Sequence, residues 1–239
     1  VTVAGDYVFR NWPSDAFQGK KLAETANEMG YKKVALITEQ QDYTFGISKT
    51  FKAKFEELGG TVVEETYLPE DTDFKTQLTK LKGEGADAFF VNPQTPVKAD
   101  SIVKQMKELG VEGPFLLNDV AGTNTDLLTN YADYFEGSYT ASPYLDETSE
   151  DFVSLKTRYN EKYGEPLQYT GYSAAGYDAL WIVANTLAEV GNDGDIVQGY
   201  LSAFPGYTGL MGETKFDENG DPLSGHSVFV IQGGKIVKR

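Results

Sequence analysis

Short apolar runs alternate with longer amphipathic segments over the first 140 residues of the chain. In the stretch 32–63, the apolar run VALI at 34–37 is typical of a strand that is buried on both faces of a sheet. Phe45, Ile47, Phe51 and Phe55 then follow at helical spacing, two glycines close the segment, and a second β-type run begins at residue 61. This order predicts a strand, a helix and a strand, whose crossover is right-handed in nearly all proteins.

The same alternation continues toward residue 141. Helical patterns cover 14–29, 72–81 and 99–109, and apolar runs at 86–92, 114–117 and 137–141 indicate further strands. We therefore predict an α/β fold with a Rossmann-like parallel sheet built from the strands near Val34, Val62, Phe89 and Phe115, and with helices on both faces.

The pattern changes after residue 141. Two helical segments follow at 150–163 and 172–190, and the second is strongly apolar around Leu180 and Trp181. Such a helix needs a large surface to pack against, so we expect a dimer, a swapped partner or disorder in this region. Near the chain ends, the pattern predicts a short strand at 7–10 and a hairpin joining 215–216 to 227–231.

Charge and composition exclude several classes of function. The net charge is −15, which opposes binding to nucleic acids and to anionic membranes. The chain has no cysteine, so disulfides and thiolate metal sites are excluded. The sequence also lacks a G-x-G-x-x-G motif and a Walker loop, so no cofactor is predicted.

Metal and catalytic candidates are few. Asp217, Asn219 and Asp221 imitate the start of an EF-hand loop, but Pro222 stands where that loop needs glycine, so a polar turn is the better interpretation and no metal is predicted. His226 is the single histidine, and we expect a solvated strand residue instead of a catalytic base.

Polar side chains follow three of the expected strands. Tyr43 comes after the first, Asn92 and Gln94 after the next, and Asn118 and Asp119 after the third. If the sheet is parallel, all five rise at one edge, where open α/β sheets bind ligands. A tyrosine, amides and one carboxylate suit a small zwitterion or cation, although strand-end loops are polar in any protein, and spacing does not choose between these readings.

Five segments together carry a family resemblance. They are FRNWPSDAFQGKKLA, GYKKVALITEQQDYTFG, TDFKTQLTKLKGEGADAFFV, GYDALWIVANTL and KFDENGDP, in this order. The chain resembles the substrate-binding proteins of branched-chain amino acid ABC importers, which have the periplasmic binding protein type I fold. The resemblance implies two Rossmann-like lobes, joined by three crossing strands, that close on an amino acid.

The resemblance also implies roles for individual residues. Tyr43 matches a tyrosine that faces the ligand, and Asp119 matches the acid that binds the α-ammonium of the ligand. Gln94 stands where the family has a second ligand-facing tyrosine, a departure that bears on branched-chain specificity. Tyr172 matches an aromatic position near the ligand side chain, and Asn92 and Asn118 complete the expected binding set.

Domain organisation follows from the same resemblance. Family members have a further N-terminal part of lobe one that has no counterpart here. We therefore expect residues 10–140 and 214–239 to form a complete second lobe. Residues 1–9 and 141–213 are expected to be a remnant of the first lobe with the hinge crossings, and the incomplete lobe would allow a dimer.

The expected function is a non-enzymatic solute-binding protein of an ABC importer, for an amino acid or a related amine-bearing solute. Its partner would be an ABC permease in the membrane, and no nucleic acid is expected. Its location would be periplasmic or anchored at the extracytoplasmic face, with the signal or lipid anchor outside this chain. The alternatives are a ligand-sensing receptor of the same fold and an α/β hydrolase, which would need a base that the strand ends lack.

Overall fold

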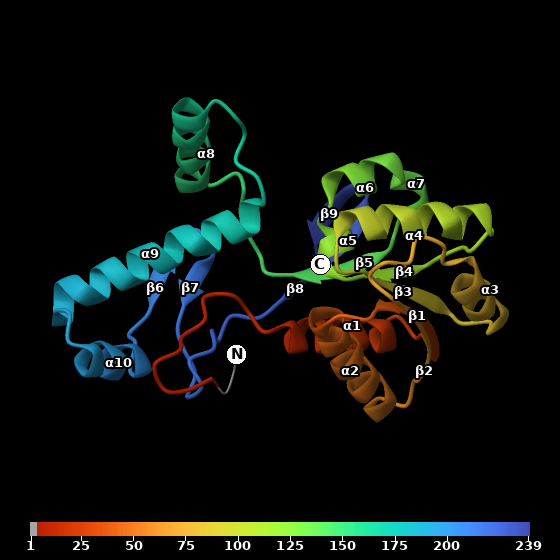
Figure 1. Cartoon of the computed structure of the whole chain (residues 1–239), viewed down its shortest axis with the longest axis horizontal. Helices are drawn as coiled ribbons and strands as arrows, with labels where there is room; N and C mark the ends of the chain where they lie inside the picture. The colour runs from red at the N-terminus through yellow and green to blue at the C-terminus, as the bar shows by residue number, and fades with distance from the viewer. Residues whose placement is uncertain (1–3) are drawn as a thin grey trace. The chain divides into compact units, whose positions relative to one another are not determined.

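The computed structural model describes residues 4–239, which form two compact units (Figure 1). The sheet unit comprises residues 15–142 and 226–239. The helical unit comprises residues 4–14 and 143–225. Along residues 4–239, no helix combines the length and the apolar character that crossing a bilayer requires.

The sheet unit is organised around one seven-stranded sheet with the order β2-β1-β3-β4-β5-β8-β9. The strands are β1 (Lys33–Glu39), β2 (Thr61–Tyr67), β3 (Ala88–Asn92), β4 (Phe115–Leu117), β5 (Tyr139–Ser142), β8 (Ser227–Gln232) and β9 (Lys235–Lys238). The first five are parallel, β8 runs antiparallel to β5, and β9 runs antiparallel to β8. The predicted parallel sheet is confirmed.

Helices cover both faces of this sheet (Figure 1). Against one face lie α1 (Asp15–Glu28) and α2 (Asp42–Glu57). Against the other lie α3 (Lys75–Gly83), α4 (Pro96–Glu108), α5 (Asp119–Gly122), α6 (Thr125–Asn130) and α7 (Ala132–Phe135). Two cores result, one on each side of the central strands.

The side chains of β1 point alternately to the two faces of the sheet, and both faces are covered by helices, which explains why the strand is continuously apolar. Val34 and Leu36 enter the core beneath α1 and α2, where Phe51 and Phe90 pack with ring centroids 4.9 Å apart. Ala35 and Ile37 point the other way and enter the opposite core. Because both faces of the strand are buried, apolar residues are favoured at its odd-numbered and its even-numbered positions alike.

The helical unit contains three helices and a small hairpin. The elements are α8 (Glu150–Tyr163), α9 (Thr170–Val190), α10 (Gly194–Ser202), β6 (Tyr207–Gly209) and β7 (Gly212–Thr214). Asp178 of α9 is buried, and its carboxylate accepts hydrogen bonds from the backbone N–H of Leu210 (2.9 Å) and Met211 (2.8 Å). This carboxylate fixes the hairpin turn to the helix.

Helix α9 carries an exposed apolar face, defined by Leu180, Trp181, Val183 and Leu187. Leu180 is 66% exposed and Trp181 is 44% exposed, whereas Ile182 is buried. The prediction that this helix is poorly covered by its own chain is confirmed for the described residues. Association through this face stays a prediction.

Two local predictions are wrong. Residues 7–10 form no strand, because the Arg10 side chain binds Asp221 (2.6 Å) while its backbone N–H bonds to the carbonyl of Gly220. The predicted hairpin from 215–216 to 227–231 is also absent, because β8 pairs with β5 and β9. The polar turn at Asp217 is as expected, with its carboxylate accepting two backbone N–H bonds.

Candidate functional site

The carboxyl ends of β1, β3 and β4 lie side by side in the sheet unit, since these strands are neighbours and parallel. Tyr43 lies in the first turn of α2, directly after β1. Gln94 lies in the loop after β3, and Asp119 is the first residue of α5, directly after β4. We call this group of loops the strand-end edge.

Tyr43 and Asp119 meet at the strand-end edge. The Tyr43 hydroxyl donates a hydrogen bond to Oδ1 of Asp119, across 76 positions of sequence. Asp119 is only 5% exposed. Its position is fixed because Asn118 caps α5, with Oδ1 accepting the N–H of Ala121 at 3.1 Å.

The Asp119 carboxylate is buried and has no cationic partner in the part of the chain that the structure describes. Burial raises the pKa of Asp119, and the Tyr43 hydroxyl and the Gln18 side chain partly offset this effect by favouring the charged form. The ion pairs among residues 4–239 do not include Asp119. A buried carboxylate without a countercharge is costly, and a positive charge placed beside it would offset part of that cost.

Gln18 is a site residue that the sequence reasoning missed. It lies on α1, is fully buried, and accepts the N–H of Asp119 through Oε1 at 3.4 Å. Its Nε2 has no hydrogen-bond partner within residues 4–239. The available signal was its spacing: Gln18, Leu22 and Ala26 share one helix face, so a polar residue interrupts an apolar stripe.

Asn92 and Asn118 tie the loops together. Both are fully buried. Nδ2 of Asn118 donates to Oδ1 of Asn92 (3.0 Å) and to the carbonyl of Pro93 (2.7 Å), while Nδ2 of Asn92 donates to the carbonyl of Thr44 (2.8 Å). These bonds connect the loops after β1, β3 and β4, so the two asparagines hold Tyr43 and Asp119 in register.

Gln94 is held by its backbone. Its N–H donates to Oε2 of Glu39 at 2.9 Å, and the same oxygen accepts the Tyr67 hydroxyl at 3.1 Å. Glu39 is buried at the end of β1, and the sequence reasoning gave it no role. The side-chain Oε1 of Gln94 is buried and has no hydrogen-bond partner among residues 4–239, which leaves one acceptor available in this loop.

Tyr172 belongs to the helical unit, whereas the other five predicted residues belong to the sheet unit. It is at the start of α9, and its ring packs on that of Trp12 with centroids 4.6 Å apart. The sheet unit therefore contains Tyr43, Asn92, Gln94, Asn118 and Asp119 as one group, and Tyr172 belongs to a separate packing unit.

The expectation for His226 is wrong. The residue stands just before β8 and is 5% exposed instead of solvated. Burial lowers the pKa of His226 to about 4, so its imidazole is neutral at pH 7.

Comparison with protein families identifies the chain. A family model described as periplasmic binding protein matches residues 2–235. The chain belongs to the periplasmic binding protein family. This family is a non-enzymatic class of extracytoplasmic solute-binding proteins, so the predicted resemblance is confirmed.

Solved structures and a curated relative are similar to the chain. Leucine binding protein LivK from Thermotoga maritima is 27% identical, with a TM-score of 0.83, over all of this chain and 68% of its own. LivJ from Streptococcus pneumoniae, in complex with isoleucine, is 28% identical, with a TM-score of 0.78. The match covers 100% of this chain and 69% of the LivJ chain. An amino acid binding protein of Pseudomonas aeruginosa is 28% identical over 226 residues, 92% of this chain and 54% of that protein. The chain thus spans about half the length of the curated relatives it matches.

Proposed function

We propose that the chain is the solute-binding component of an ABC importer and takes an amino acid or another amine-bearing solute at the strand-end edge. The observation that carries this proposal is the buried carboxylate of Asp119, which accepts the Tyr43 hydroxyl and has no ion-pair partner among residues 4–239. An ammonium group of a solute would supply the missing countercharge.

The charge of the solute decides how well it would bind beside Asp119. An ammonium would form charge-assisted hydrogen bonds with Asp119, each worth about 1.5–3 kcal/mol. A second carboxylate at the same place would be repelled, and a neutral group would leave the buried charge uncompensated. Relatives named for leucine binding, or solved with isoleucine, support an amino acid as the first class to test.

Individual residues have distinct proposed roles. Asp119 binds the ammonium, Tyr43 orients the carboxylate, and Gln94 offers its buried Oε1 to a donor on the solute. Asn92 and Asn118 shape the edge through their loop contacts. For Tyr172, a contact with the solute side chain is proposed from the family resemblance alone.

We also propose that the sheet unit corresponds to the second lobe of the family and the helical unit to part of the first. The unit boundaries fall at residues 14–15, 142–143 and 225–226, so residues 10–14 and 214–225 pack with the helical unit. The proposed partner is an ABC permease, at the extracytoplasmic face of a membrane.

The test is calorimetric titration of the full-length protein with a panel of amino acids and their deaminated analogues. Replacing one partner of a buried charge pair typically costs about 2–5 kcal/mol, so Asp119→Asn should weaken binding roughly thirtyfold or more. Asp133→Asn, at an exposed position of α7, removes the same charge and should leave affinity unchanged. Equal binding of deaminated analogues, or an unaffected Asp119→Asn variant, would overturn the proposal.

A sensor of the same fold is distinguished by a second assay. The importer proposal predicts that solute-loaded protein stimulates ATP hydrolysis by its reconstituted ABC permease. A protein that binds the solute and leaves every candidate permease unaffected would favour the receptor.

A further inference from the structure

Gln18 is a fully buried amide on the inner face of α1. Leu22 and Ala26 of the same helix belong to the apolar core beneath α1 and α2. Oε1 of Gln18 accepts the backbone N–H of Asp119, whereas its Nε2 has no hydrogen-bond partner within residues 4–239. Burying an amide is costly unless its polar atoms are hydrogen-bonded. An apolar side chain would fill this place without that cost, so packing alone does not account for the glutamine.

Helices α1 and α2 are in close contact beside Gln18. A Cβ atom at Gly19 would lie 2.5 Å from the carbonyl oxygen of Ile47 in α2, and closer still to Oγ1 of Thr50. Glycine therefore allows the two helices to approach at this point. The contact fixes α1 against α2, which carries Tyr43 in its first turn. Gln18 and Tyr43 thus belong to two helices that cannot shift independently.

Both side chains meet Asp119, the first residue of α5. The Tyr43 hydroxyl donates to Oδ1 of Asp119, and Gln18 accepts the Asp119 N–H at 3.4 Å. Burial raises the pKa of Asp119, and the Tyr43 hydroxyl, the Gln18 side chain and the backbone N–H groups of Val120 and Asp119 lower it. Tyr43 is the titratable side chain that faces the carboxylate from α2. The Gln18 side chain therefore favours the charged form of Asp119.

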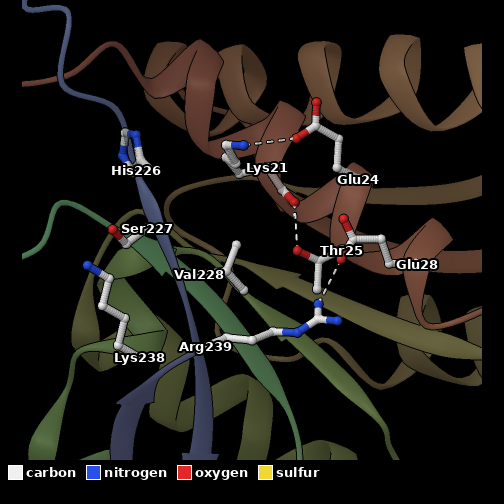
Figure 2. A pocket seen from close by; sticks show the side chains of 9 residues that line it. All are labelled: Lys21, Glu24, Thr25, Glu28, His226, Ser227, Val228, Lys238 and Arg239. Carbon is white, nitrogen blue, oxygen red and sulfur yellow. Dashed lines mark hydrogen bonds and ion pairs between the residues drawn. The ribbon is translucent and has the colours of Figure 1, made fainter.

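The charged side chains of α1 in Figure 2 have partners of their own. Lys21 is paired with Glu24 at 3.2 Å, and Glu28 is paired with Arg239, the residue after β9, at 3.0 Å. All four are exposed. The partner that α1 gives to the buried Asp119 is instead a neutral amide. A neutral donor leaves the negative charge of Asp119 uncompensated, so an ammonium group can still supply the countercharge.

We propose that Gln18 is a positioning residue of the solute site, with Oε1 holding the backbone of Asp119 and Nε2 donating to the Asp119 carboxylate in the solute-bound protein. This inference rests on the proposed function, because it concerns the carboxylate that would take the solute ammonium. The terminal torsion of glutamine is broad, so a turn of the amide brings Nε2 toward the carboxylate. Gln18 then keeps Asp119 ionised and oriented for an amine-bearing solute.

The first measurement needs no solute. In the full-length protein with isotope-labelled aspartate, NMR follows the side-chain carboxyl resonance of Asp119, which is assigned by its loss in Asp119→Asn. Gln18→Met removes both polar atoms of the amide and keeps the length of the side chain. The midpoint of the Asp119 titration should rise by about one pH unit, because a donor to the charged form is lost. Tyr43→Phe removes the other side-chain donor and should move the midpoint in the same direction.

Matched variants separate this role from packing. Gln77 lies on α3, against the opposite face of the sheet, and Gln77→Met should leave the Asp119 titration unchanged. Gln18→Leu is a second apolar replacement with the same expected shift as Gln18→Met, and circular dichroism checks the fold of both. A glutamine that only fills space would alter stability on replacement and leave the Asp119 midpoint at its wild-type value.

Calorimetric titration with L-leucine at a series of pH values tests the role in binding. The affinity of the wild type should fall toward acid pH as Asp119 takes up a proton, and Gln18→Met should move this fall upward by about one pH unit, as in the NMR titration.

Two results would contradict the inference in different ways. If Tyr43→Phe moves the Asp119 midpoint and neither Gln18→Met nor Gln18→Leu does, Gln18 is not a positioning residue. If L-leucine and its deaminated analogue isocaproate bind equally well, the proposed function fails, and the role of Gln18 in solute binding fails with it, whatever the NMR titration gives.

Discussion

The two units bury their apolar residues to very different extents. In the sheet unit, the central strands are covered on both faces, and aromatic side chains such as Phe51, Phe90 and Phe115 are fully buried. In the helical unit, the 21-residue helix α9 exposes Leu180, Trp181 and two further apolar side chains. The sheet unit therefore buries its large apolar side chains within itself, whereas the helical unit leaves those on one face of α9 exposed.

This difference shows that an apolar pattern along a helix does not ensure that the helix is buried by its own unit. A helix that is apolar on most of its circumference is typical of a buried position. Fully burying one large apolar side chain stabilises a protein by about 1.5–3 kcal/mol, so four exposed ones represent a substantial unused contribution. We therefore expect the helical unit to unfold more readily than the sheet unit.

The largest effect is expected from a core truncation in the sheet unit. Phe51→Ala should lower the free energy of unfolding by about 3–5 kcal/mol, because its ring packs between Phe55 and Phe90. The control is Phe17→Ala, at an exposed position of the same unit, which should cost far less.

Spectroscopy can separate the two units in this experiment. Both tryptophans of residues 1–239, Trp12 and Trp181, lie in the helical unit. Tryptophan fluorescence should therefore change at lower urea concentration than far-UV circular dichroism, and Phe51→Ala should move mainly the second transition. Coincident transitions in the wild-type chain would contradict the proposed difference between the units.

The next effect is the acid sensitivity of the sheet unit. The pKa of His226 is lowered to about 4, below its ordinary value of about 6.5, so the unfolded chain binds more protons between these pH values. The free energy of unfolding should therefore fall as the pH drops from about 6.5 to about 4, by about 3 kcal/mol.

The matched variant isolates this contribution. His226→Phe cannot take up the proton, so the difference between its stability and that of the wild type should change across this pH window. Urea unfolding at a series of pH values measures that difference. A pH-independent difference would show that His226 is solvated in the folded protein.

Hydrophobic periodicity was sufficient to predict the parallel strands of the sheet unit and the helices between them. The run at 34–37 and the helical spacing of Phe51 and Phe55 correspond to β1 and α2, because a strand buried on both faces has no freedom to include polar residues. The convergence of Tyr43 and Asp119 was also predictable, since carboxyl ends of neighbouring parallel strands must meet at one edge.

Other features depend on contacts that no local pattern encodes. Gln18 reaches Asp119 across 101 positions of sequence, and Glu39 reaches the backbone of Gln94 across 55. The burial of His226 follows from its place where the chain enters β8. The hairpin prediction was wrong for the same reason, a contact that is distant in sequence: β8 pairs with β5, which precedes it by more than 80 residues.

A smaller effect is expected at Asp119 in the absence of solute. The pKa of Asp119 is raised, so the folded state holds the proton more tightly than the unfolded state. The free energy of unfolding therefore falls as the pH rises from the pKa of the unfolded chain through the higher pKa of the folded protein. Asp119→Asn should therefore stabilise the ligand-free protein at pH 7 by about 1 kcal/mol while weakening solute binding. Thermal unfolding with and without solute measures both changes, and a destabilised variant would contradict the assignment of an unpaired buried charge.

The smallest effect on unfolding, and the most specific to the helical unit, concerns the exposed face of α9. Leu180→Glu should change the free energy of unfolding by about 0.5 kcal/mol or less, because the side chain is largely exposed in a single chain. The same change should abolish self-association of residues 1–239, since a charge on this apolar face opposes its burial in a dimer. Sedimentation velocity of both proteins over a range of concentrations measures this, with Val97→Glu, at an exposed apolar position of α4, as the matched control. A wild-type chain that stays monomeric at every concentration would show that exposed apolar side chains on α9 do not by themselves drive association.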